Sequence, residues 1–363
     1  LEIIRLLSLE GSITSLYGDQ AHGHTFTVRS IYQGAGVSKG LAGNRRFLTP
    51  MNISVIPKLF RTRQLPVHAA LVQVSPPDDL GWMSLGISVD VTLAAAKSAD
   101  RVIAQVNPRM PRVLGNCFLH VSEVDALVER EEELLTILDF PEPEASAAIA
   151  RLVANLIEDG ATIQVGLGDC GASILHALAE KNDLGVHTQY MTDGIMELVR
   201  RGVVTNRHKT LHEGKLIASN AIGSTELYNF LDNTASVEFH PSDYVNAPAV
   251  IAQNRKMVAI NIATAIDLTG QVAAEALPQN QYSGVTGMFE FIDGASYASE
   301  GKSIIVLPST QADGASRIVA QLDSGAVFIP RSHVSHVVSE YGAVNIFGKN
   351  LQERALSMIS LAH

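Results

Sequence analysis

Apolar and polar residues follow a clear strand, loop and helix pattern in the middle of the chain. Ile163 and Val165 alternate with polar neighbours and predict a strand, which runs into the glycine-rich segment 166–171. Residues 172–180 then carry apolar side chains at helical spacing and predict a helix. A second strand is expected over residues 184–188. The rest of the chain is interpreted around this unit of strand, glycine loop, helix and strand.

The glycine loop is a candidate binding element. Gly166, Gly168 and Gly171 form a GxGxxG pattern where a strand gives way to a helix. Backbone amides at such a junction can hold an oxyanion or a phosphate, because no side chain covers them. A tight turn that only packs is an equal alternative. A Rossmann-type dehydrogenase is the weakest interpretation, because no acidic residue stands at the distance expected of a ribose-binding strand.

Shorter apolar runs predict further strands in the first half of the chain. Residues 1–9 and 25–31 favour a strand or a short helix, and the run AALVQV at residues 69–74 favours a buried strand of a parallel sheet. His68 and His120 are conspicuous in the same half. Neither has a partner carboxylate at a recognisable spacing, so we expect both to be structural.

The clearest break in the pattern is the acidic, proline-containing run DFPEPE at residues 139–144. We place a domain boundary there, with one α/β domain over residues 1–140 and a second over residues 145–363. The patterns VQVSPPDDLGWMSLG and INIATAIDLTGQVAA, one from each half, are similar. The sequence therefore predicts an α/β fold of two related open domains, with the active site in the cleft between them.

Composition and charge exclude several classes of function. The 363 residues are 46% hydrophobic and 18% charged, and a formal net charge of −10 without a basic stripe argues against a nucleic-acid partner. Cys117 and Cys170 have neither metal nor disulfide spacing, which favours a reducing cytoplasm and predicts no metal site. We expect no membrane partner, because no apolar run is long enough to span a bilayer.

The central unit also resembles a known family. The chain reads GLGDCG, a helix and then LGVHTQYMTDG, where members of the acetyl-CoA hydrolase/transferase group of class I CoA-transferases read GIGAIP, a helix and LGIHTEM. The likeness continues in SPPDDLGWMSLGISVD, against SPPDEHGYCSLGVSVD, and in VVTNRHKTLHEGKLIAS, against VITNRKKTLHPGKIVAS. The group includes 4-hydroxybutyrate CoA-transferases. By this resemblance, the family's first strand and helix are expected to precede Leu1.

The resemblance implies an enzyme that moves CoA between an acyl-CoA and a short-chain carboxylic acid through a glutamyl-CoA thioester. The family's nucleophile is the glutamate of HTE, and the position that it maps to holds Gln189. A carboxamide is neutral and a poor nucleophile. An inactivated variant made to hold a complex is the favoured interpretation. An acyl-CoA hydrolase and a non-catalytic acyl-CoA-binding paralogue are the alternatives.

The resemblance also implies where CoA is held. The expected CoA contacts lie in the glycine loop, in a second glycine turn and at a lysine near the C-terminus: Gly166, Leu167, Gly168, Asp169, Cys170, Gly284, Val285, Gly287 and Lys349. CoA is a substrate here, and no tightly bound cofactor is expected. A cytoplasmic homodimer in acetate metabolism is the implied setting. The acid itself stays open among 4-hydroxybutyrate, acetate, butyrate and itaconate.

Overall fold

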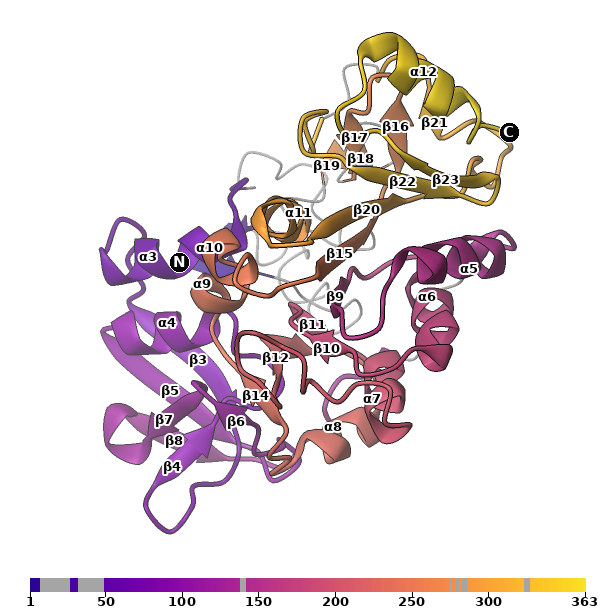
Figure 1. Cartoon of the computed structure of the whole chain (residues 1–363). Helices are drawn as coiled ribbons and strands as arrows, with labels where there is room; N and C mark the ends of the chain where they lie inside the picture. The colour runs from indigo at the N-terminus through magenta and orange to yellow at the C-terminus, as the bar shows by residue number, and fades with distance from the viewer. Residues whose placement is uncertain are drawn as a thin grey trace.

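The computed structural model is an α/β protein (Figure 1). It describes residues 1–6, 27–31, 49–137, 142–274, 276–277, 281–282, 286–322 and 327–363. Within these ranges, no helix is both long enough and apolar enough to cross a bilayer. Figure 1 shows the first half of the chain at the lower left and the C-terminal strands with the last helix, α12 (Leu351–Ile359), at the top.

The largest sheet has six strands in the order β10-β9-β15-β20-β22-β23. Its first five strands are parallel and the last pair is antiparallel. The strands span Gly185–Val186, Thr162–Val165, Met257–Ile262, Lys302–Val306, His336–Ser339 and Gly342–Asn345, in that order. The sheet is thus built on the strand that the sequence pattern predicts at residues 163–165, and that prediction is confirmed.

Helices cover both faces of the large sheet. Along β15, Val258 and Ile260 belong to one apolar core, while Met257 and Ala259 belong to another that includes residues of α11 (Met288–Tyr297). Alternate residues of a strand point to opposite faces, so each core lies on its own side of the sheet. A strand buried on both sides reads as a continuous apolar run, and this is why β15 is so easily found in the sequence.

The predicted helix at residues 172–180 forms as α6 (Gly171–Ala177), continued by the short 3-10 helix η5 (Leu178–Glu180). Helix α5 (Ser146–Leu156) packs against α6. The strand expected over residues 184–188 is shorter than predicted, because only Gly185–Val186 pair within the sheet. Leu184 and His187, on either side of this pair, form single bridges with Val204 and Ile217 instead.

A smaller parallel sheet lies in the first half of the chain, in the order β3-β5-β8. These strands span Ala69–Val74, Arg101–Val106 and Ala126–Glu129, and helix α4 (Thr92–Ser98) packs on β3. The parallel pairing predicted for residues 69–74 is confirmed, but their complete burial is wrong. Ala70 and Val72 are buried, whereas Leu71 is 78% exposed. The cause is that α4 covers only one face of β3, and Leu71 points to the other face.

The two halves of the chain share a third sheet, in the order β12-β14-β6. Its strands span Leu216–Ala218, Val237–Phe239 and Leu114–Gly115, so β6 of the first half pairs with β14 of the second. The largest apolar core likewise contains residues from both halves. The boundary predicted at residues 139–144 stays a prediction, and residues 139–141 of it lie outside the described part of the chain.

The other elements are short and connect these sheets. Strands Glu2–Arg5 and Thr27–Ser30 confirm a strand in each of the two N-terminal segments, as far as the described residues reach. The remaining elements with described ends are η3 Ile53–Val55, α3 Ile56–Arg61, β4 Trp82–Ser84, β7 Phe118–His120, η4 Val121–Glu123, β11 Tyr190–Met191, α7 Asp193–Arg200, β13 Asn220–Ala221, α8 Thr225–Leu231, α9 Ser242–Val245, α10 Pro248–Ile251, β16 Ala265–Asp267, β17 Val272–Ala273, β18 Ala276–Leu277, β19 Gln281–Tyr282 and β21 Ile318–Val319.

Replacing Gly115 by alanine tests how closely the two halves are joined. At φ +115°, an added Cβ would lie 2.3 Å from the Phe239 carbonyl oxygen, so the backbone of β6 or β14 must shift. At Gly214, φ is +75° and an added Cβ meets nothing within 4 Å, so Gly214→Ala carries only the conformational cost of about 1–2 kcal/mol. We expect Gly115→Ala to lower the free energy of unfolding, measured in urea, by at least about 2 kcal/mol more than Gly214→Ala. Equal losses would contradict the close approach.

Candidate active site

The glycine loop is shaped by the neighbouring strand β15. Gly166 N donates a hydrogen bond to Ile260 O at 2.8 Å, and an added Cβ on Gly166 would lie 2.8 Å from Asn261 Oδ1. Gly168 has φ +145°, and an added Cβ there would lie 3.0 Å from Ile262 Cδ1. Both glycines are therefore required because the loop crosses closely over the end of β15.

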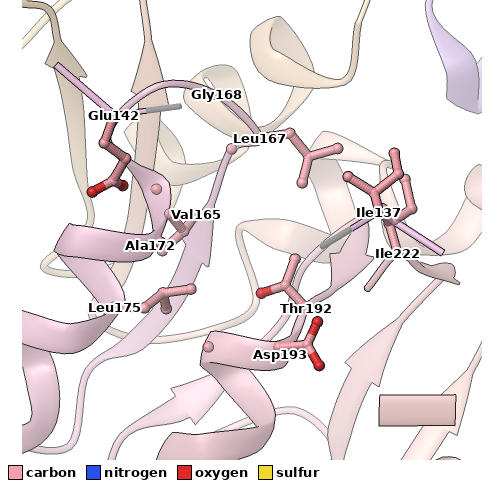
Figure 2. A pocket seen from close by; sticks show the side chains of 13 residues that line it. Ile137, Glu142, Val165, Leu167, Gly168, Ala172, Leu175, Thr192, Asp193 and Ile222 are labelled. Atoms are coloured by element: carbon pink, nitrogen blue, oxygen red, sulfur yellow. The ribbon is translucent and has the colours of Figure 1, made fainter. Parts of the chain in front are cut away.

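The loop forms one wall of a hollow of about 640 Å³, a volume that includes its opening to solvent. Gly166, Leu167 and Gly168 line it, together with Thr192 and Asp193 at the start of α7. Figure 2 shows Leu167 beside two further apolar side chains on one side of the hollow, with Thr192 and Asp193 below them. Three of the five predicted loop residues thus face one cavity.

The other two predicted loop residues make different contacts. The Asp169 carboxylate lies 3.7 Å from the guanidinium of Arg317. Cys170 is fully buried at the start of α6, where Ser146 Oγ donates to its Sγ at 3.4 Å. Burial raises the pKa of the Cys170 thiol. Neither residue is among those that line the hollow.

Gln189 lies between β10 and β11 and is held on both its backbone and its side chain. Its carbonyl oxygen accepts hydrogen bonds from the backbone N–H groups of Ser219 and Asn220, at 3.1 and 3.0 Å. Its side-chain Oε1 accepts from Asn246 Nδ2 at 3.2 Å. The residue is 7% exposed. The Gln189 carboxamide is therefore fixed in one orientation and nearly closed to bulk water.

Gly287 lies directly against this carboxamide. An added Cβ on Gly287 would lie 2.1 Å from Gln189 Oε1 and 2.4 Å from Asn246 Nδ2. Its φ of −70° is ordinary, so close approach and not backbone conformation requires the glycine. The structure thus brings together Gln189 and Gly287, which the sequence predicts separately. Gly284 and Val285 of the same predicted turn lie outside the described residues.

An acidic side chain, Glu290, is linked to Gln189 through Asn246. Glu290, on α11, is fully buried, and its Oε2 accepts from Asn246 Nδ2 at 3.1 Å. Its Oε1 accepts from the backbone N–H of Ser54 at 3.0 Å. Both hydrogen bonds favour the carboxylate form, but burial outweighs them and raises the pKa of Glu290 to about 7. Glu290 is thus a carboxyl group poised to titrate near neutral pH.

Asn246 and Ser54 were not singled out by the sequence analysis. Asn246 stands in YVNAP, two residues before the proline that begins α10, and this is a recognisable motif without an obvious chemical role. Ser54 contributes its backbone N–H and its side chain, from the short helix η3. Ser54 and Glu290 are 236 positions apart, so no local pattern in the sequence indicates their contact.

A second hollow lies between the two halves of the chain, next to the same site. Its walls include Leu71 and Val72 of β3 from the first half, and Asn220 and Tyr228 from the second. Tyr190, which follows Gln189 directly, also lines it. Gln189 is therefore at the junction of the halves, where the predicted α/β arrangement expects the active site.

Lys349 is not brought to this junction. Its Nζ donates to Ser357 Oγ at 2.8 Å, and the residue lies just before α12. Figure 1 shows α12 at one end of the molecule, well away from β11. The CoA contact predicted for Lys349 stays a prediction.

Comparison with known proteins identifies a family for this chain. The family model of the acetyl-CoA hydrolase/transferase N-terminal domain matches residues 19–139, and that of the C-terminal domain matches residues 223–363. The chain is 42% identical over 365 residues to a 4-hydroxybutyrate coenzyme A transferase of Clostridium kluyveri, covering 100% of this chain and 84% of that protein. It is 39% identical over 349 residues to a succinyl-CoA:acetate/propanoyl-CoA:succinate CoA transferase of Fasciola hepatica, covering 95% of this chain and 73% of that protein.

Solved structures show the same architecture. The crystal structure of RipA from Yersinia pestis is similar with a TM-score of 0.86 and 36% identity, covering 93% of this chain and 78% of that chain. A 4-hydroxybutyrate CoA-transferase from Porphyromonas gingivalis is similar with a TM-score of 0.79 and 36% identity, covering 93% of this chain and 83% of that chain. The predicted α/β fold class is confirmed by these neighbours.

The raised pKa of Glu290 makes stability depend on pH. Between its usual pKa of 4.5 and about 7, the folded protein keeps a proton that the unfolded chain has released, so stability falls as pH rises through this window. Glu290→Gln abolishes this titration and should flatten the fall by about 3 kcal/mol, measured by urea unfolding across the window. Glu129→Gln, an exposed change on β8, is the matched control and should leave the slope unchanged. A Glu290→Gln protein with the parent's slope would show that Glu290 titrates normally.

Proposed function

Since the chain belongs to the acetyl-CoA hydrolase/transferase family, we propose that it exchanges CoA between an acyl-CoA and a short-chain carboxylic acid, with the reacting side chain at position 189. With Gln189 in place, the exchange is impaired, because a carboxamide is a poor nucleophile. The observation that carries the proposal is the Gln189 side chain itself, held by Asn246 against Gly287 at the junction of the two halves.

The proposed reaction needs a carboxylate at position 189. A glutamate there attacks the thioester carbonyl, and the carbon–sulfur bond breaks to give an acyl-glutamyl anhydride and CoA thiolate. The thiolate attacks the glutamyl carbonyl, releases the first acid and leaves a glutamyl-CoA thioester. The second acid attacks this thioester and forms a new anhydride, and CoA thiolate then attacks the new acyl carbon. A new acyl-CoA leaves and the glutamate is regenerated.

The surroundings of position 189 support this chemistry. Asn246 Nδ2 donates to the side-chain oxygen there, and the same bond to a carboxylate would be stronger because the acceptor is charged. Glu290, bound to the same amide group, has its pKa raised to about 7 and is therefore largely protonated at slightly acid pH. A protonated Glu290 is neutral. It therefore does not repel a carboxylate nucleophile at position 189, as a charged Glu290 would.

We assign the binding of CoA to the glycine loop and its hollow. The backbone amides of residues 166–170 are the proposed donors for an oxyanion or a phosphate, and those of Gly284, Val285 and Gly287 are the proposed second set. Lys349 is a proposed contact for a CoA phosphate at longer range. CoA enters as a substrate, and no tightly bound cofactor takes part in the proposal.

Two functions other than CoA transfer could use the same site. A hydrolase needs a base that can reach water. The titratable carboxyl coupled to Gln189, Glu290, is fully buried and already occupied by Ser54 and Asn246, so it does not favour that alternative. A non-catalytic acyl-CoA-binding protein is favoured by one observation, the carboxamide at position 189. Hydrolysis of an acyl-CoA by the parent protein, or its absence, distinguishes the hydrolase from the binding protein.

Restoring glutamate tests the proposed role of position 189. We expect Gln189→Glu to raise CoA transfer between an acyl-CoA and a short-chain acid by several orders of magnitude, because this side chain forms every covalent intermediate. The affinity for CoA should change by only a few-fold. Intact-mass spectrometry of Gln189→Glu with acyl-CoA should show a covalent adduct that the parent protein lacks.

The matched control is Gln253→Glu, the same chemical change at an exposed position. It should neither raise turnover nor form an adduct. Equal transfer rates for the parent protein and Gln189→Glu, with no adduct in either, would show that position 189 is not the nucleophile. Glu290 would then be the carboxylate to substitute next.

Ligand binding at the glycine loop is tested separately from turnover. An acyl-CoA at 100 times its Kd should stabilise the native protein by about 2.7 kcal/mol and raise its Tm. Leu167→Glu places a negative charge in the hollow. Because CoA is anionic, at least tenfold more acyl-CoA should then be needed for the same rise in Tm. Leu127→Glu, on the half-exposed strand β8, is the control and should respond as the parent does. The absence of any shift at millimolar acyl-CoA would count against CoA as the substrate.

A further inference from the structure

Two histidines and a glutamate gather on the second half of the chain, apart from the residues assigned to the reaction. Glu238 lies on β14 and His240 follows that strand, so the two are two residues apart on an extended chain and share one side of it. His212 comes from the loop between α7 and β12. One potential ligand atom of each lies within 4.8 Å of those of the other two. The three side chains are partly buried.

The distances within this group fit a small divalent cation. His240 Nε2 lies 3.3 Å from Glu238 Oε2, and His212 Nδ1 lies 3.9 Å from the same oxygen. Tetrahedral zinc with ligands at about 2.0–2.1 Å holds those ligands about 3.3 Å apart. One pair already has this separation, and the other two need small side-chain movements. A water molecule would complete the tetrahedron as the fourth ligand.

The hydrogen bonds around the group orient the ligand atoms inward. His212 Nε2 lies 2.6 Å from Tyr244 Oη, so the tautomer with a proton on Nε2 donates to the tyrosine and leaves the Nδ1 lone pair facing Glu238. Lys215 Nζ lies 3.3 Å from Glu238 Oε1, which leaves Oε2 for the histidines. A histidine fixed through its second nitrogen is the arrangement that metal-binding histidines usually have.

Two ammonium groups lie near a cation at this position. Lys215 Nζ is 3.3 Å from Glu238 Oε1, and Lys209 Nζ donates to the carbonyl oxygens of Val186 and Lys215. Burial lowers the pKa of Lys209 to about 7, so this residue can give up its proton when a second cation arrives.

We propose that His212, Glu238 and His240 form a binding site for one zinc ion, with water as the fourth ligand. The ion ties the loop of His212 to the end of β14 and lies beside α9, which carries Tyr244. The sequence predicts no metal site because that expectation rests on its cysteines, whereas this group contains none. The two nitrogens and one oxygen are a donor set that zinc binds commonly.

The experiment titrates chelator-treated protein with Zn²⁺ in competition with a chromophoric chelator. We expect one ion per chain, and His212→Asn or Glu238→Gln should weaken binding at least about tenfold. His208→Asn, an exposed histidine of the same loop, is the matched control and should bind as the parent does. Tyr244→Phe keeps all three ligands and should weaken binding by a smaller factor, because it removes only the orienting hydroxyl.

A second measurement uses the parent protein alone, so its result does not depend on whether a variant folds. Cobalt(II) bound to the parent protein should give the intense visible bands of a four-coordinate ion, and Zn²⁺ should abolish them. No stoichiometric binding, a pale six-coordinate cobalt spectrum, or binding that His212→Asn and Glu238→Gln both leave unchanged would each overturn the proposal. CoA transfer by Gln189→Glu is measured separately, so failure of the zinc site leaves the proposed function standing.

Discussion

The side-chain amide of Asn246 is the point on which the candidate active site depends. Its Nδ2 donates both to Gln189 and to Glu290, and Glu290 in turn accepts from the Ser54 backbone. Three segments of the second half and one of the first are thereby fixed relative to one another. Gly287 closes the group by packing against both amides at a separation that no side chain could tolerate. The site is thus rigid before any ligand arrives, which is what covalent chemistry at a single side chain requires.

Much of the fold could be predicted where the causes are local. The strand at residues 162–165, its glycine loop and helix α6 follow from the order of apolar, glycine and helical positions in one continuous segment. The strand β3 shows the limit of such reasoning. Its run AALVQV is apolar except for Gln73, yet Leu71 is largely exposed, because whether the second face of a sheet is covered depends on distant segments.

The candidate site was predicted in part for the same reason. Gln189, the glycine loop and Gly287 have recognisable motifs, whereas the bonds that hold them join residues 57, 44 and 236 positions apart. Periodicity and short motifs carry no information about such pairs. His212 and Glu238 were likewise invisible, because the loop and the strand that bring them together are linked by α8 and not by any motif.

The burial of Cys170 has a consequence for a protein whose proposed substrate, CoA, is a thiol. Its Sγ is fully buried in the glycine loop and accepts a hydrogen bond from Ser146, and Cys117 is equally buried with its pKa raised to about 12. Disulfide exchange begins with a thiolate that can reach its target. A protein that handles CoA is exposed to CoA disulfides whenever the cell is oxidised. By keeping both sulfurs protonated and covered, the fold protects itself from mixed disulfides, and Cys170 lies in the very loop on which CoA is proposed to rest.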